Sequence, residues 1–222
     1  MSFIKVFERL VNLLFPELCI KCDKYNTAFC NICLSTIPKG GFTEVENTYA
    51  LFSYKDKYIH DSIWAMKYSN NKSFAKVFGT RLSEIIEEDI IEKNYFINSY
   101  ILIPVPISKK KKRVRGYNQT EWLADSIIEN LNSEIKNKIT YRKDIIKRQH
   151  RDQTQARTRN KKNRLEQIEG AYYIAEDKRG VLKDKNIILI DDVTTTGGTI
   201  KEIKKILDKE KIASFVAYTV AH

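Results

Sequence analysis

The sequence NIILIDDVTTTGGT, residues 186–199, decides the fold of this chain. It begins with a continuous apolar run, which is typical of a parallel strand buried on both faces. Two acids, Asp191 and Asp192, end the run. A loop of threonine and glycine follows, and we predict a helix over 199–209. Ligands of open parallel sheets bind beyond the carboxyl ends of the strands, so these residues are candidates for a binding site.

The loop after the strand has the chemistry of a phosphate site. Its glycines let the backbone approach a ligand, and the helix N-terminus offers N–H groups and a positive dipole end. The carboxylates can accept hydrogen bonds from a vicinal diol, and a phosphorylated ribose carries both groups. The candidate phosphate-binding residues of this loop are Thr194, Thr195, Thr196, Gly197, Gly198 and Thr199.

A purely structural explanation is a core strand followed by a capped helix. Thr199 and Glu202 have the spacing of a capping box, which supports that explanation. A structural turn, however, needs neither two adjacent acids nor this density of threonine and glycine. The pattern therefore favours a binding site.

Four cysteines form two C-x-x-C pairs near the N-terminus, at Cys19, Cys22, Cys30 and Cys33. Each pair can supply two thiolates, and together they complete a tetrahedral zinc site with no open position for a catalytic water. A four-cysteine iron–sulfur site is the alternative. Disulfides are disfavoured, because no export signal is recognised and we expect a cytoplasmic protein with reduced thiols. We predict a structural zinc ion.

The 222 residues carry a net charge of +11, with a pI near 9.3. Such a balance favours a polyanion as partner, although a lysine-rich proteome would give a similar total. Clustering supports the first explanation, because Lys109–Arg115 and Lys147–Arg164 are both dense in Lys and Arg. We predict loops in both regions. The candidate nucleic-acid-binding residues are Lys110, Lys111, Lys112, Arg113, Lys147, Arg148, Arg151 and Arg157, with Tyr117, Tyr141 and Tyr172 as stacking partners.

Apolar periodicity predicts strands and helices in alternation, which indicates an α/β fold with a parallel sheet. The predicted strands are 48–54, 100–105, 144–147, 187–191 and 213–220, and the predicted helices are 56–68, 73–90, 117–131 and 199–209. An amphipathic helix is expected at the N-terminus, before Pro16, docked on the protein body. No apolar run is long enough for a transmembrane helix.

Four segments together carry a resemblance to a known family. The acids and loop at 191–199 resemble the signature of type I phosphoribosyltransferases. WAMKY at 64–68, PVPISKKKKRVRGYNQTEWLA at 104–124 and RQHRDQTQARTRNKKNR at 148–164 follow the four cysteines in an order similar to that of the ComF (ComFC, GntX-like) family. This resemblance covers the chain from about Leu18 onward.

The resemblance implies a type I phosphoribosyltransferase-like parallel sheet flanked by helices over 41–222, behind a helix and double zinc knuckle over 1–40. It implies that Asp191 and Asp192 hold the ribose hydroxyls of phosphoribosyl pyrophosphate or ribose 5-phosphate. Lys109 and Arg115 would then lie near the pyrophosphate, which brings Mg²⁺, and Lys67 would be a further phosphate contact.

The family is associated with natural transformation, so the resemblance implies binding of single-stranded DNA during DNA uptake. It also implies competence proteins such as a DNA helicase as partners. Two alternatives stay open: an active phosphoribosyltransferase whose acceptor the sequence does not indicate, and a non-catalytic sensor of phosphoribosyl pyrophosphate.

Overall fold

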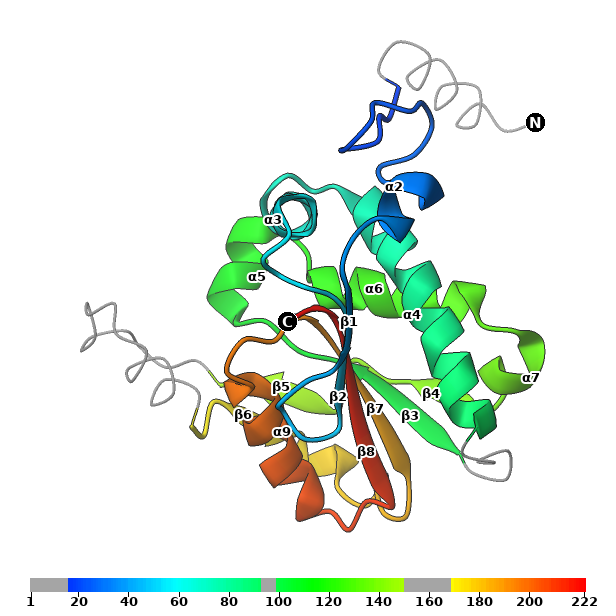
Figure 1. Ribbon diagram of the computed structural model, residues 1–222. Coiled ribbons are helices and arrows are strands. Elements are labelled where there is room, and N and C mark those ends of the chain that lie inside the picture. The colour runs from blue at the N-terminus through cyan, green and yellow to red at the C-terminus, as the bar shows by residue number, and fades with distance from the viewer. Residues whose placement is uncertain (1–15, 93–98, 150–168) are drawn as a thin grey trace, which may run out of the picture.

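The protein is described by a computed structural model that places residues 16–92, 99–149 and 169–222. At its centre is a six-stranded sheet in the order β1-β2-β8-β7-β3-β4 (Figure 1). All neighbouring strands are parallel except β1, which is antiparallel to β2 at the edge. The strands are β1 (Lys39–Phe42), β2 (Thr48–Phe52), β3 (Tyr100–Pro104), β4 (Ile139–Tyr141), β7 (Asn186–Val193) and β8 (Ser214–Ala221).

Helices cover both faces of the sheet. One hydrophobic core contains residues of α3, α4 and α6, and the other contains residues of α9 and of an antiparallel β5–β6 hairpin. The remaining described elements are α2 (Asn31–Ser35), α3 (Lys57–Tyr68), α4 (Lys72–Glu92), α5 (Lys109–Arg115), α6 (Gln119–Asn130), α7 (Ser133–Lys136), β5 (Ile146–Arg148), β6 (Tyr172–Ile174), a 3₁₀ turn (Glu176–Lys178) and α9 (Gly198–Asp208).

Strand β7 lies between the two cores and is buried along almost its whole length. Ile188 and Ile190 belong to the core under α4 and α6, whereas Ile187 and Leu189 belong to the core under α9. This alternation follows from the two-residue repeat of a strand. By the same repeat, Asp192 is directed to the α6 side of the sheet and its neighbour Asp191 to the α9 side.

The predicted α/β class with a central parallel sheet is confirmed. Two local predictions are wrong. Residues 109–115 form helix α5, not a loop, because Ser108 caps its first turn and Gly116 ends it at a φ of 84°. The capping box is also absent, since α9 begins after Gly197 without a side-chain cap and Glu202 accepts the N–H of Gly170 instead. The predicted N-terminal helix and most of the second basic cluster, at 150–164, lie outside the described residues.

The cysteine segment packs onto the main core on the α4 side. Phe29, Leu34 and Ile37 are buried in the same cluster as Met66 of α3. Such a short segment buries little apolar surface by itself, so this packing supplies much of its stability. Figure 1 shows α2 above the α3 and α4 end of the molecule, apart from α9.

The contact between α4 and α6 depends on a glycine at their closest approach. A Cβ atom at Gly79 would lie 2.5 Å from both the Cβ and the Oγ of Ser126. We therefore expect Gly79→Ala to lower the free energy of unfolding by about 1–3 kcal/mol through overpacking, measured by urea denaturation. Adding Ser126→Gly should restore part of the loss, and Lys76→Ala on the exposed face is the control. An unchanged stability in Gly79→Ala would contradict this packing.

Candidate functional site

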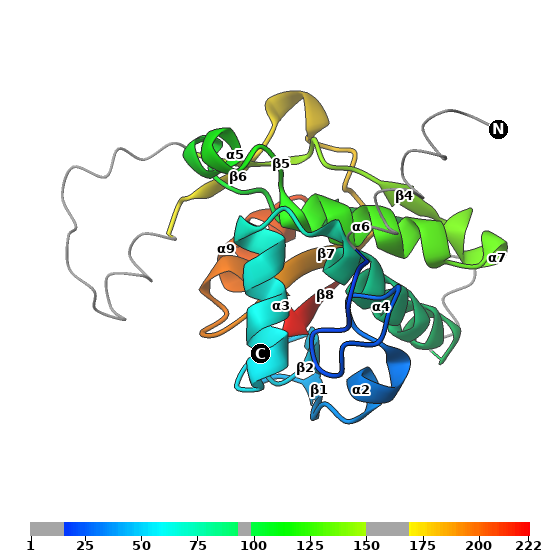
Figure 2. The ribbon, with the colours of Figure 1, turned by 90° about the horizontal axis from the view of Figure 1, so that it is seen from above.

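A pocket of about 190 Å³ lies at the carboxyl edge of the sheet, where β3 and β7 end. It combines two carboxylates with several cations and with the first turn of α9. Helices α3 and α5 lie above this edge (Figures 1 and 2). The residues that line it and that matter here are Lys67, Lys111, Arg115, Gln119, Arg148, Tyr172, Asp191, Asp192 and Thr199.

Asp192 is held on the α6 side by two side chains from distant parts of the sequence. The Lys67 ammonium group, at the end of α3, lies 2.8 Å from its Oδ1 atom. The Gln119 amide, in the first turn of α6, donates to its Oδ2 atom. Burial lowers the pKa of Lys67, but the charge and hydrogen bond of Asp192 outweigh this and raise it overall. Lys67 therefore stays charged and balances a carboxylate that is 5% exposed.

Asp191 faces the other side of the sheet, and its environment differs. One of its oxygens accepts the backbone N–H of Asp192 at 2.9 Å. Burial, followed by the negative charge of Asp192, raises the pKa of Asp191 to about 7, although that N–H, Lys67 and Arg148 act in the opposite direction. A carboxyl with such a pKa is shared between its protonated and ionised forms at neutral pH. It can donate to a ligand or accept from one.

The loop after β7 is fixed by its glycine and by the end of the last strand. Gly197 has a φ of 72°, and a Cβ atom there would lie 2.4 Å from the side chain of Val45, so only glycine fits without a shift. The backbone N–H of Thr194 donates to Ala221, and the ring of His222 lies 3.1 Å from the Thr194 carbonyl oxygen. No pattern in the sequence indicates this role of His222.

Cations from three elements converge on the pocket. Arg115 donates from the end of α5 to Gln119, and the guanidinium of Arg148 lies over the Tyr172 ring at 5.2 Å. Partial desolvation of the Lys111 ammonium group, and then the nearby charges of Arg148, Arg115 and Lys67, lowers the pKa of this otherwise exposed residue. A bound anion would reduce the repulsion between these positive groups. Of the two basic residues predicted near a pyrophosphate, Arg115 lines the pocket and Lys109 does not.

The predicted nucleic-acid-binding residues divide into groups. Lys110, Lys111, Lys112 and Arg113 are exposed on α5, where Lys112 also pairs with Glu121 at 3.2 Å. Lys147 is exposed on β5, whereas Arg148 belongs to the pocket. Arg151 and Arg157 lie outside the described residues.

The three rings predicted as stacking partners are not placed for that role. Tyr172 is buried, and Tyr141 is packed against the main core. Tyr117 stacks on Trp122 at 3.9 Å, and its hydroxyl accepts the N–H of Asn70. These positions correct the prediction, because the sequence did not indicate which rings the core would take up.

The four cysteines form one cluster. Their sulfur atoms all lie within 4.8 Å of one another, and the Cys22 and Cys30 sulfurs are 3.7 Å apart. A tetrahedral zinc ion with Zn–S bonds of about 2.3 Å has sulfurs about 3.8 Å apart, so the cluster fits this metal. Burial raises the pKa of Cys19, but backbone N–H groups outweigh it and lower the pKa to about 6, whereas the hydrogen bond with Cys22 raises the pKa of Cys33.

Known proteins match this chain at the level of one family model and of several curated relatives. The family model of the phosphoribosyl transferase domain matches residues 122–222. The chain is 30% identical over 163 residues to Competence protein ComFC of Streptococcus pneumoniae, which covers 72% of this chain and 61% of that protein. It is 24% identical to Competence protein ComFC of Bacillus subtilis, covering 77% and 62%. One solved structure, a hypoxanthine phosphoribosyltransferase of Staphylococcus aureus, aligns with a TM-score of 0.41 at 13% identity, over 67% of this chain and 63% of that one.

The fold and the matched domain define a phosphoribosyltransferase-like protein. Within that class, the chain belongs to the ComF family of competence proteins. It spans about three fifths of the length of the two ComFC relatives. Among the described residues, no helix is long and apolar enough to cross a membrane.

Because the pKa of Asp191 is raised in the folded protein, ionising this group at high pH should lower the free energy of unfolding. The group titrates near 3.8 when unfolded and at about 7 when folded, so between these values the native state binds more protons. The free energy of unfolding should therefore fall as pH rises through this window. Asp191→Asn removes the cost, and its advantage should be larger at pH 8 than at pH 5.5 by on the order of 2 kcal/mol.

Urea denaturation at the two pH values measures this difference. Asp184→Asn, on an exposed turn before β7, controls for the loss of one negative charge. An advantage of Asp191→Asn that is equal at both pH values would show that Asp191 does not titrate in this range.

Proposed function

We propose that this protein binds a phosphorylated ribose, phosphoribosyl pyrophosphate with Mg²⁺ or ribose 5-phosphate, in the pocket at the end of β7, and that it binds single-stranded DNA during natural transformation. The observation that supports the first part is the meeting of a carboxylate pair, a helix N-terminus and several cations in one pocket. The second part rests on the competence relatives and on the exposed basic face of α5.

The pocket has complementary groups for each part of a ribose phosphate. The loop over 194–199 and the first turn of α9 would hold the 5′-phosphate through backbone N–H groups. Asp191 and Asp192 would accept hydrogen bonds from the ribose hydroxyls. Lys111 and Arg115, which line the same pocket, would meet a pyrophosphate and its Mg²⁺. The Lys67–Asp192 ion pair must open or rearrange for the hydroxyls to reach Asp192.

The exposed cations of α5 would hold the DNA. Lys109–Arg115 presents six positively charged side chains beside the pocket, and single-stranded DNA carries a phosphate at every nucleotide. Lys111 and Arg115 belong to both the pocket and this surface. A strand lying on α5 would therefore compete with phosphoribosyl pyrophosphate for the same two side chains.

Fluorescence anisotropy with a labelled oligothymidine tests both parts. We expect salt-steep binding that is displaced by phosphoribosyl pyrophosphate with Mg²⁺. Asp191→Ala with Asp192→Ala should abolish the displacement and leave the DNA affinity within about threefold, because these acids do not contact the strand. Lys110→Gln with Arg113→Gln should weaken DNA binding and reduce the salt slope by roughly 0.7 for each lost phosphate contact.

Matched controls are Lys183→Gln and Lys209→Gln, two exposed lysines away from α5. These two substitutions remove the same total charge as Lys110→Gln with Arg113→Gln. They should change the DNA affinity and the salt slope less than that pair does. No binding of the strand at low salt would refute the DNA function. Failure of phosphoribosyl pyrophosphate to bind, measured separately by calorimetry, would refute the ligand site.

We also propose that Cys19, Cys22, Cys30 and Cys33 bind one structural zinc ion, so that residues 1–40 form a zinc module on a phosphoribosyltransferase-like domain over 41–222. The support is the closeness of the four sulfurs and their fit to a zinc tetrahedron. The site would be closed by protein ligands. Its contribution is to folding and not to catalysis.

Cys22→Ser tests the zinc with little change in packing, because Cys22 is the exposed member of the four. We expect the zinc content, measured by atomic emission, to fall from about one per chain to near zero, and the Tm to fall by about 5 °C or more. Ser35→Ala on α2 is the control and should keep both values. A purified protein with full stability and no metal would contradict the proposal.

A further inference from the structure

Helix α3 carries two exposed aromatic side chains one turn apart. Trp64 is 53% exposed and Tyr68 is 64% exposed, although the opposite face of the same helix is buried in the core. Their ring centroids are 5.2 Å apart with an angle of 45° between the planes, so the two exposed rings form one aromatic patch on the helix. Large rings at this exposure cost solvation free energy, and a stripe of them marks a binding surface.

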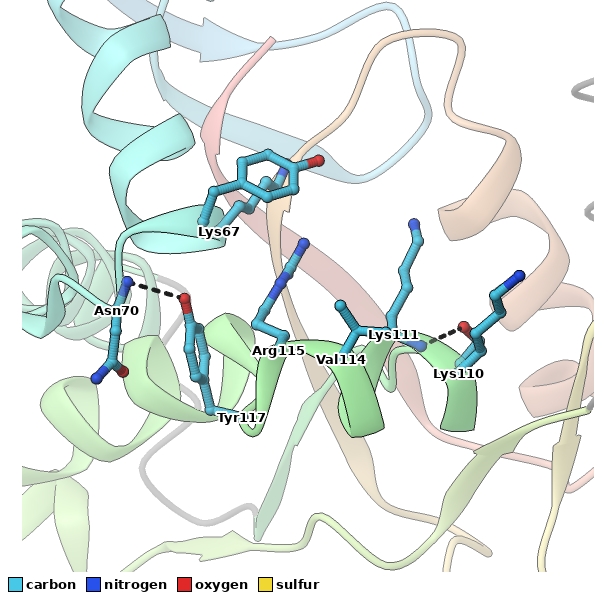
Figure 3. Close-up of a pocket in the computed structure, with 9 residues that line it drawn as sticks. Lys67, Asn70, Lys110, Lys111, Val114, Arg115 and Tyr117 are labelled. Atoms are coloured by element: carbon cyan, nitrogen blue, oxygen red, sulfur yellow. Dashed lines mark hydrogen bonds between the residues drawn. The ribbon is translucent and has the colours of Figure 1, made fainter.

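Tyr68 borders a second and larger cavity between α3 and α5. This cavity has a volume of about 430 Å³, and Lys67, Lys110, Lys111 and Arg115 supply its charges. None of its nine lining residues is an acid. Figure 3 shows Lys111 and Arg115 extending from α5 into this space, toward Lys67 at the end of α3. The guanidinium of Arg115 lies 5.2 Å from the Tyr68 ring.

We infer that Trp64 and Tyr68 form a stacking platform for two unpaired bases of single-stranded DNA, with the backbone phosphates on Lys110, Lys111 and Arg115 of α5. This inference rests on the DNA-binding part of the proposed function and gives it a location. Exposed rings next to a carboxylate-free basic cavity are what a single strand requires, because its bases offer flat faces and its backbone offers negative charge.

The exposed rings and the basic cavity together favour single-stranded DNA over other ligands. Trp64 does not line the cavity, so a single small base held there would leave this ring unused. An apolar peptide would not need four cations without any acid among the lining residues. Paired bases in a duplex hide their faces, so stacking on these rings selects unpaired DNA.

Tryptophan fluorescence reports on the platform directly, because Trp64 and Trp122 are the two tryptophans of the chain. In Trp122→Phe, Trp64 is the remaining indole, and we expect oligothymidine to quench its emission. In Trp64→Phe, Trp122 remains, stacked on Tyr117, and we expect little quenching. The opposite pattern would overturn the inference.

Affinity measurements with an abasic strand of the same length and charge separate stacking from phosphate contact. The unaltered protein should bind oligothymidine more tightly than the abasic strand. Trp64→Ala and Tyr68→Ala should each lose about 5- to 100-fold for oligothymidine, with little change in the salt slope or in the abasic affinity. Tyr68→Phe should restore the affinity, because the ring does the stacking.

Phe42→Ala is the matched control. Phe42 is 71% exposed on β1, but it pairs with Tyr49 near the start of β2, at the edge of the sheet away from the site. It should bind DNA as the unaltered protein does. An oligothymidine affinity that stays unchanged in both Trp64→Ala and Tyr68→Ala would overturn the platform and leave the DNA-binding function standing, whereas no DNA binding by the unaltered protein would refute both.

Discussion

The burial of two neighbouring carboxylates at the end of β7 is the constraint on which the site depends. An unpaired buried charge is costly, and the chain compensates Asp192 with Lys67 from α3 and Gln119 from α6. These two contacts bring α3 and α6 to the carboxyl edge of the sheet. Asp191 forms no ion pair with any residue that the structure describes, and its pKa is raised instead. The pocket therefore already holds a charged Lys67–Asp192 pair beside a carboxyl of raised pKa before any ligand enters it.

The rest of the architecture places cations around that pair. Ser108 starts α5 immediately beyond β3, so its Lys111 and Arg115 side chains reach the pocket from above. The β5–β6 hairpin brings Arg148 and Tyr172 from the other side of the sheet. Neighbouring cations that lower one another's pKa are stabilised when an anion arrives. Electrostatics thus point to a phosphorylated ligand at this edge, with a longer polyanion able to continue over α5 and α3.

The sequence predicted those parts of the fold that apolar periodicity controls. The buried run of β7, the strand β3 and the amphipathic α6 were all expected close to their positions. Helix α5 was missed because its lysines have no apolar period, although Ser108 and Gly116 were available as cap signals. The exposure of Trp64 and the burial of Tyr172 were not predictable, because both depend on which segments pack together far along the chain. The Lys67–Asp192 pair joins residues that are far apart in the sequence, so no local pattern indicates it.

A crystal structure of the protein with ribose 5-phosphate tests the central claim most directly, since it shows phosphate and hydroxyls at once. We expect the phosphate at the N-terminus of α9, contacted by backbone N–H groups of residues 194–199. We expect the ribose hydroxyls on Asp191 and Asp192, with the Lys67 ammonium group moved away from its 2.8 Å contact with Asp192. A ligand bound elsewhere, or an empty pocket at saturating ligand with that ion pair intact, would contradict the account.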